Sequence, residues 1–191
     1  SSIDILRKSA YVNQVIVASD NVETAREAEA LGAYSPFIRP SELSAEIVNL
    51  ERVQQYSLEE LEKADIFPDI IVHLEETFPF RPPDLIDNMI KQLIEGGFDT
   101  VIAAKEEPGW LWRQNDNGDI KRIDKGDIPR KFKEKILIGL PGLGLITYPE
   151  LIRKQNVFKN KVGFFETKIP TASIEVRNKE EMSLVKKLLK N

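Results

Sequence analysis

Residues 69–83, DIIVHLEETFPFRPP, decide the fold that the sequence predicts. The run from Asp69 to Leu74 is apolar and β-branched, which predicts a buried strand. Three prolines within residues 77–83 exclude a helix there and predict a stiff loop. Residues 84–93 then carry apolar side chains at helical spacing, and Gly96 and Gly97 end that helix. Strand, loop and helix in this order are typical of an α/β protein.

The same alternation of apolar runs and amphipathic stretches continues on both sides of this unit. Further strands are predicted at residues 14–19, 36–38, 100–104 and 173–176, and further helices at residues 22–31, 41–64, 148–155 and 179–189. Because strands that alternate with helices usually pair in parallel, we expect a mostly parallel sheet in a single domain over residues 1–191. Residues 106–135 break the pattern, and the turn sequence Asn115–Gly118 predicts an inserted β-hairpin arm there.

Composition narrows the function classes. The chain has 191 residues, 27 Lys and Arg, 31 Asp and Glu, one His, no Cys and a formal net charge of −4. The absence of Cys excludes thiol catalysis and Cys-based zinc sites, and a single histidine, His73, argues against a His-built metal centre. The chain lacks the basic balance typical of nucleic-acid binding, and no apolar run approaches the ~20 residues of a membrane span. We therefore expect a soluble, cytoplasmic domain that binds neither nucleic acid nor membrane.

Polar residues follow several of the predicted strands, where ligands bind in parallel α/β sheets. Asp20 suits a metal or ribose ligand, or alternatively a helix cap. Arg39 suits a phosphate, a base edge or a carboxylate, or alternatively lies on the surface before a turn. The loop at residues 75–81 places two carboxylates, the Thr77 hydroxyl and Arg81 on a proline-stiffened backbone. This pattern favours a ligand site over a core-anchored turn with a salt bridge.

Three further features have two interpretations each. Glu175 and Arg177 lie two residues apart on a predicted strand, so their side chains face the same side. Glu175 suits Mg²⁺, which takes oxygen ligands and bridges phosphates, or alternatively forms a salt bridge. The glycines of Gly139–Gly144 lack the spacing of a phosphate-binding loop and favour a close backbone approach instead. His73, in the middle of a strand, is expected to be either a core histidine with its hydrogen bonds satisfied or a half-buried one.

Four segments together carry a family resemblance. They are residues 15–20 (VIVASD), 37–43 (FIRPSEL), 69–81 (DIIVHLEETFPFR) and 174–182 (IEVRNKEEM). In this order they resemble the motifs VVVSTD, FLRPAEL, DIVVLLQPTSPLR and IDIDTPEDL of the acylneuraminate (sialic acid) cytidylyltransferase family. The resemblance extends over almost the whole chain, and the segments at Arg39-Pro40 and Thr77–Arg81 match best.

The resemblance implies a GT-A-like, Rossmann-like α/β fold and a reaction between CTP and a nonulosonic or related 2-keto sugar acid. The products are a CMP-sugar and pyrophosphate, and Mg²⁺ offsets charge on the phosphates. The arm at residues 106–135 resembles the dimerisation arm of the family, so a homodimer is expected. No catalytic residue is assigned. The implied contacts are Arg39 and Asp20 with the nucleotide, Glu75, Thr77 and Arg81 with the sugar acid, and Glu175 and Asp20 with the metal.

The chain departs from the family at several of these positions. Glu75 replaces a Gln that meets the sugar, Arg177 replaces a second metal-binding Asp, and residues 46–50 (EIVNL) replace a polar DTASS run. The opening strand and Gly/Arg/Lys-rich loop of the family, IIPARGGSKGIPGKN, have no match, so we expect this phosphate-binding loop to be missing from a chain that begins at Ser1. Two alternatives therefore stay open: a catalytically weakened nucleotide- or sugar-binding or assembly domain of the same fold, and an enzyme for another nucleotide.

Overall fold

The computed structural model describes residues 2–45, 47–124, 126 and 128–189. Its helices are α1 (Ser2–Lys8), α2 (Val22–Ala30), α3 (Leu50–Lys63), α4 (Leu85–Gly96), α5 (Pro149–Arg153) and α6 (Lys179–Leu188). Its strands are β1 (Ile71–His73), β2 (Thr100–Glu106), β3 (Trp112–Gln114), β4 (Ile120–Arg122), β5 (Leu137–Gly139), β6 (Leu145–Thr147) and β7 (Val162–Glu166). Short 3₁₀ helices are η1 (Ser41–Ser44), η2 (Arg130–Phe132) and η3 (Pro170–Ser173). None of the helices in these ranges combines the length and the apolar character needed to cross a bilayer.

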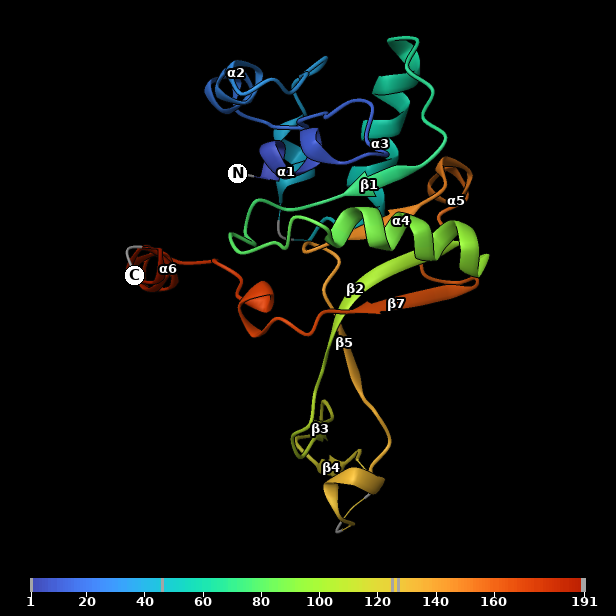
Figure 1. Cartoon of the computed structure of the whole chain (residues 1–191), viewed down its shortest axis with the longest axis vertical. Helices are drawn as coiled ribbons and strands as arrows, with labels where there is room; N and C mark the ends of the chain where they lie inside the picture. Colours follow the sequence, from blue (N-terminus) through green and yellow to red (C-terminus); the bar gives the residue numbers. More distant parts are fainter. Residues whose placement is uncertain (1, 46, 125, 127, 190–191) are drawn as a thin grey trace.

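β2 lies at the centre of the main sheet and pairs with β5, β6 and β7, while β1 pairs with β6. The expected α/β fold is confirmed. The expected mostly parallel pairing is not, because among the described strands of this sheet only β2 and β7 run in parallel, and the other pairs are antiparallel. β5 and β6 follow the arm, through which the chain reverses direction and returns along β2 (Figure 1). Strand spacing alone does not reveal such a return.

β5 and β6 continue one another along a single edge of β2. Leu140 N donates to Ala103 O at 2.7 Å, and Ala103 N donates to Gly144 O at 2.8 Å. Between these two bonds the chain makes a tight turn, which we call the glycine loop (residues 140–144). The loop reaches the carboxyl end of β1, where its Gly142 O accepts a hydrogen bond from Glu75 N. An interruption in a strand therefore positions the glycine loop against the residues after β1.

Helices cover both faces of the main sheet (Figure 1). On one face, Met89 and Leu93 of α4 pack with Val101 of β2 in the larger core cluster. On the other face, α3 and α5 pack against Ile102 and Leu145. Neighbouring residues of β2 serve opposite cores because successive strand side chains point to opposite faces. The two buried layers hold β1 and β2 in place, and ligands were expected at the carboxyl ends of these strands.

The chain before β1 and after β7 is less regular than the sequence predicted. The strand expected at residues 14–19 reduces to one parallel bridge, between Ile16 and Tyr34, and residues 36–38 form no strand. The helix expected over residues 41–64 is instead η1 followed by α3. The strand expected at residues 173–176 is wrong, because η3 includes Ser173 and the next residues are extended but not part of a strand. Figure 1 shows α6 at the end of this extended connection, to one side of the sheet.

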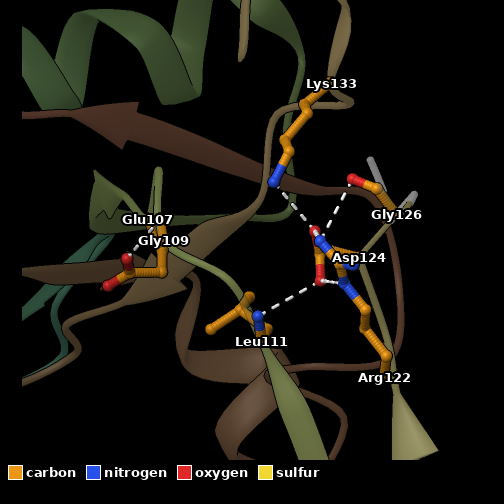
Figure 2. A network of polar contacts seen from close by, with 7 residues as sticks. All are labelled: Glu107, Gly109, Leu111, Arg122, Asp124, Gly126 and Lys133. Atoms are coloured by element: carbon orange, nitrogen blue, oxygen red, sulfur yellow. Dashed lines mark hydrogen bonds and ion pairs between the residues drawn. The ribbon is translucent and has the colours of Figure 1, made fainter. Parts of the chain in front are cut away.

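The predicted turn at Asn115–Gly118 is confirmed, and β3 and β4 pair around it in an antiparallel hairpin. Figure 1 shows this hairpin within the arm (residues 106–135), which extends away from the main sheet. Figure 2 shows Asp124 at the centre of the arm's polar network: it accepts from Arg122 Nε at 2.8 Å, Lys133 Nζ at 2.9 Å and Leu111 N at 3.2 Å. The two cations, Arg122 first, hold the pKa of Asp124 far below its ordinary value.

Candidate functional site

The loop after β1 carries Glu75, Thr77 and Arg81, the residues that the sequence assigned to the sugar acid. Glu75 N donates to Gly142 O at 2.8 Å, which ties this loop to the glycine loop. A Cβ added to Gly142 would lie 2.7 Å from Glu75 Cδ and 2.8 Å from a ring carbon of Phe78, so a larger residue does not fit. Phe78 is buried in the core beneath α4 and anchors the loop. The close backbone approach predicted for these glycines is confirmed at Gly142.

Arg81 lies beneath this loop and is only 4% exposed. Its Nε donates to Leu143 O at 2.9 Å, and its Nη2 donates to Glu75 O at 2.7 Å and Gly142 O at 3.0 Å. Its Nη1 also donates to the Ser2 hydroxyl of α1. Because these bonds use most of the five N–H donors of a guanidinium, Arg81 braces the two loops. Burial lowers the pKa of Arg81 to about 10, which leaves it a cation at neutral pH.

The Glu75 carboxylate lies beside other polar groups near the end of β1. His73 Nε2 is 3.9 Å from Glu75 Oε1, which is beyond hydrogen-bond distance. His73 and, more weakly, Arg177 lower the pKa of Glu75 against the opposing effect of burial, so Glu75 is an anion at neutral pH. His73 is half-buried, which is one of the two placements expected, and its Nε2 is buried without a hydrogen-bond partner in the described ranges. The buried Thr77 Oγ1 also lacks a partner of normal geometry there, although it contributes slightly to the lowered pKa of Glu75.

Glu175 approaches the same loop from the chain between η3 and α6. Val176 N donates to Thr77 O at 2.8 Å, which fixes this segment against the loop. Glu175 Oε1 lies 2.6 Å from Arg177 Nη2, so of the two interpretations of Glu175 the salt bridge is present. Glu175 raises the pKa of Arg177, and the charge of Glu75 adds to the effect. The structure therefore brings Glu75, Thr77 and Glu175 together and adds Arg177 to them.

Asp20 and Arg39 form a separate group with Ser44. Arg39 Nη2 donates to Ser44 Oγ at 3.0 Å. The Ser44 hydroxyl first, and the charge of Arg39 after it, lower the pKa of Asp20. Asp20 is not the helix cap, because Asn21 caps α2 instead. Arg39 Nε is buried and has no hydrogen-bond partner in the part of the chain that the structure describes, so one donor of the guanidinium is unused.

The candidate site thus consists of two groups of residues. The loop group contains His73, Glu75, Thr77, Glu175 and Arg177. The strand-end group, named for the two strands predicted before Asp20 and Arg39, contains Asp20, Arg39 and Ser44. Within the described ranges, no hydrogen bond or ion pair joins one group to the other. Sequence reasoning missed Ser44, which no motif singles out. It also undervalued His73, although two residues of spacing on an extended segment place His73 and Glu75 on one side.

The residues do not fit a metal ion held by protein ligands alone. Glu175 is bound to the Arg177 guanidinium, whose charge repels a cation. Among the described residues, no cluster of three or more His, Cys, Asp or Glu side chains is arranged to hold a metal ion. Protein-bound Mg²⁺ usually takes one or two carboxylates together with water and substrate phosphates. A Mg²⁺ requirement therefore stays a prediction about the complex with a nucleotide.

In open α/β sheets, ligands bind beyond the carboxyl ends of the strands, as at the loop that follows β1 here. A family model described as cytidylyltransferase matches residues 2–127, which include the strand-end group and the loop after β1. The chain belongs to the cytidylyltransferase family. No curated protein sequence matches it.

Solved structures share the fold over nearly the full chain. CMP:2-keto-3-deoxy-manno-octonic acid synthetase complexed with CTP has a TM-score of 0.68 at 14% identity, with 99% of this chain and 86% of the other covered. The 4-diphosphocytidyl-2C-methyl-D-erythritol synthase of Anaerococcus prevotii has a TM-score of 0.71 at 12% identity, with 99% and 84% covered. Another structure of a 4-diphosphocytidyl-2C-methyl-D-erythritol synthase has a TM-score of 0.66 at 11% identity, with 98% and 87% covered. At these identities the likeness establishes the Rossmann-like fold.

Proposed function

We propose that this chain transfers the cytidylyl group of CTP to an acidic sugar, a nonulosonic or related 2-keto sugar acid. Membership of the cytidylyltransferase family supports the use of CTP. One structural neighbour is named for a 2-keto sugar acid, which supports an acceptor of that class. The observation that carries the proposal is the loop group, where the anion Glu75 and the exposed cation Arg177 lie near each other. A hydroxy acid offers a hydroxyl to the first and a carboxylate to the second.

In the proposed reaction, a hydroxyl oxygen of the sugar attacks the α-phosphorus of CTP. The bond from that phosphorus to the pyrophosphate oxygen breaks, and the hydroxyl proton is released. Transfers of this kind depend mainly on positioning and on electrostatic stabilisation of the phosphates. We expect Mg²⁺ to enter with CTP, and chelation of the ion to stop turnover.

The two groups of residues take different parts in this proposal. Arg39 and Asp20 are proposed for the nucleotide, and the unused, buried Nε donor of Arg39 supports a role in binding an anion. Glu75 and Thr77 are proposed for the sugar acid. Arg81 acts on the sugar only indirectly, because its donors are turned to backbone carbonyls.

A comparison of nucleotides tests the nucleotide part of the proposal. Calorimetry with CTP, UTP and ATP is expected to give the tightest binding with CTP, and the Arg39→Met variant is expected to weaken that binding. Arg26→Met, at an exposed position on α2, is the matched control and should bind CTP like the unmodified chain. Preferential binding of UTP or ATP would instead support an enzyme for another nucleotide.

The alternative of a catalytically weakened binding or assembly domain rests on a specific observation. Glu175, the expected metal ligand, is occupied by Arg177 at 2.6 Å. Tight CTP binding without pyrophosphate release, for every sugar acid supplied with Mg²⁺, would favour this alternative over the enzyme.

We also propose that the chain forms a homodimer through the arm and acts in the cytoplasm. Support for the dimer comes from large apolar side chains that the arm exposes to solvent. Their exposed fractions are 60% for Trp110, 51% for Trp112, 68% for Ile120 and 65% for Phe132. Exposed apolar groups gathered on one projecting element are typical of a protein interface.

A further inference from the structure

Arg177 has a backbone that is fixed from two sides. The residue before it is bound to the loop after β1, because Val176 N donates to Thr77 O at 2.8 Å. Its own N donates to Glu181 Oε2 at 2.6 Å, and the next residue, Asn178, is the N-cap of α6 in a capping box. Arg177 is therefore placed beside Glu75 by contacts that do not involve its side chain.

The Arg177 side chain remains available to a ligand. The side chain is 71% exposed, and Arg177 Nη2 forms an ion pair with Glu175 Oε1 at 2.6 Å. Glu175 raises the pKa of Arg177, with smaller effects from Glu75 and Glu181, so the group stays charged. A planar guanidinium with five donors has room for a second planar anion.

The other arginines of the candidate site do not offer an exposed guanidinium to the loop group. Arg81 is buried and its donors are turned to the carbonyls of Glu75, Gly142 and Leu143. Arg39 belongs to the strand-end group, where it donates to Ser44. Among the arginines described here, Arg177 is the one that combines exposure with a position beside Glu75.

We propose that Arg177 binds the carboxylate of the acidic acceptor while Glu75 accepts a hydrogen bond from a hydroxyl of the same molecule. This assignment rests on the proposed function and makes Arg177 a residue that determines acceptor specificity. An incoming carboxylate replaces or shares the contact that Glu175 makes now, so one carboxylate exchanges for another of the same charge. A phosphate of charge near −2 would be repelled more strongly by the two glutamates, which favours a carboxylate as the recognised group.

Matched acceptors and variants test this assignment. The acceptors are N-acetylneuraminic acid and 2-keto-3-deoxy-manno-octonic acid, each as the free acid and as its methyl ester, which keeps the hydroxyls and removes the charge. Arg177→Gln is expected to raise KM for the acids about 10- to 100-fold, the loss typical of a charge-assisted hydrogen bond, and to leave KM for the esters within about twofold. Arg177→Lys keeps the charge without the planar fork and should recover part of the loss.

Arg153→Gln is the matched control, because Arg153 of α5 forms an ion pair with Glu62 of α3. The exposed fractions are 50% for Arg153 and 27% for Glu62, against 71% for Arg177 and 26% for Glu175. This control should leave KM unchanged for acids and esters alike. Urea unfolding of each variant checks that its folding is intact. Equal effects of Arg177→Gln on acid and ester, or no effect on either, would overturn the assignment.

Failure of the assignment and failure of the proposed function give different results. Turnover of CTP with the esters or neutral sugars in preference to the acids would overturn the role of Arg177 and leave cytidylyl transfer intact. If CTP is not turned over at all, the proposed function fails, and calorimetry with the two free acids then tests Arg177 directly. Binding of an acid that Arg177→Gln abolishes supports the assignment, whereas absent or unchanged binding contradicts it.

Discussion

The carbonyl oxygen of Leu143 accepts a hydrogen bond from Arg81 Nε at 2.9 Å, within the protein interior. The same guanidinium holds the carbonyls of Gly142 and Glu75. One buried cation therefore joins the glycine loop to the loop after β1. The position of Glu75 depends on this joint, because Glu75 lies on one of the two loops and contacts the other.

Replacing Arg81 by Met is expected to lower the free energy of unfolding by roughly 2–4 kcal/mol, because the carbonyls of Leu143, Gly142 and Glu75 each lose a buried or partly buried hydrogen bond. Urea unfolding measures the change. Arg113→Met, at an exposed position in the arm, serves as the control and should stay within about 0.5 kcal/mol of the unmodified chain. A loss of the same small size for Arg81→Met would mean that it does not brace the loops.

Substitution of Gly142 by Ala tests the close approach of the two loops. The new Cβ would lie 2.7 Å from Glu75 Cδ and 2.8 Å from a ring carbon of the buried Phe78, so the Glu75 side chain and the Phe78 ring must both move. We expect a loss of roughly 1–3 kcal/mol in the free energy of unfolding, as for other overpacked sites. Gly139→Ala is the control, because its Cβ would meet its nearest neighbours at 3.7 Å. Similar stability of both variants would contradict the contact.

Much of the fold was predictable from local pattern, but strand direction was not. The apolar run at residues 69–74 and the turn at Asn115–Gly118 gave β1 and the hairpin correctly. The antiparallel return of β5 and β6 depends on bonds between Ala103 and residues far along the chain, to which no local signal points. The extended segment after Ser173 follows a 3₁₀ turn started by Pro170, and its residues bind a loop instead of a sheet.

The candidate site was also predictable only where local sequence pattern determines it. The residue types after β1 predicted Glu75 and Thr77 as site residues. The fold brings Glu175, which is distant in the sequence, to the same loop. The sequence predicts Arg81 as a ligand group, because nothing in the pattern of an arginine between Pro79 and Pro82 indicates burial. Its inward direction follows from tertiary packing, which leaves three backbone carbonyls in reach.

Asp124 makes the stability of the arm depend on pH. Its pKa in the folded protein lies below the ordinary value of 3.8, first because of Arg122 and then because of Lys133. The unfolded chain therefore binds more protons in the acidic range, so the stabilisation is present above about pH 4 and is lost as pH falls further. Urea unfolding should show Asp124→Asn less stable than the unmodified chain at neutral pH, with the gap narrowing toward about pH 3. A gap that is constant with pH would contradict the charge network.

The arm is expected to hold two copies of the chain together. Analytical ultracentrifugation at micromolar concentration should show a dimer, and Phe132→Glu should shift it to monomer because a charge would be buried in the apolar contact. Phe67→Glu is the control, since Phe67 is 68% exposed against 65% for Phe132 but lies in the connection between α3 and β1. A monomeric unmodified chain, or equal behaviour of the two variants, would count against the arm.

The most direct test of the account is whether the protein forms a CMP-linked sugar from CTP. Incubation with CTP, Mg²⁺ and the free sugar acids, followed by mass spectrometry of the product and measurement of pyrophosphate, gives both halves of the reaction. The account predicts equal amounts of CMP-sugar and pyrophosphate, with CTP preferred over UTP and ATP. Pyrophosphate and CMP-sugar that stay at background with every sugar acid, despite CTP binding, would contradict it.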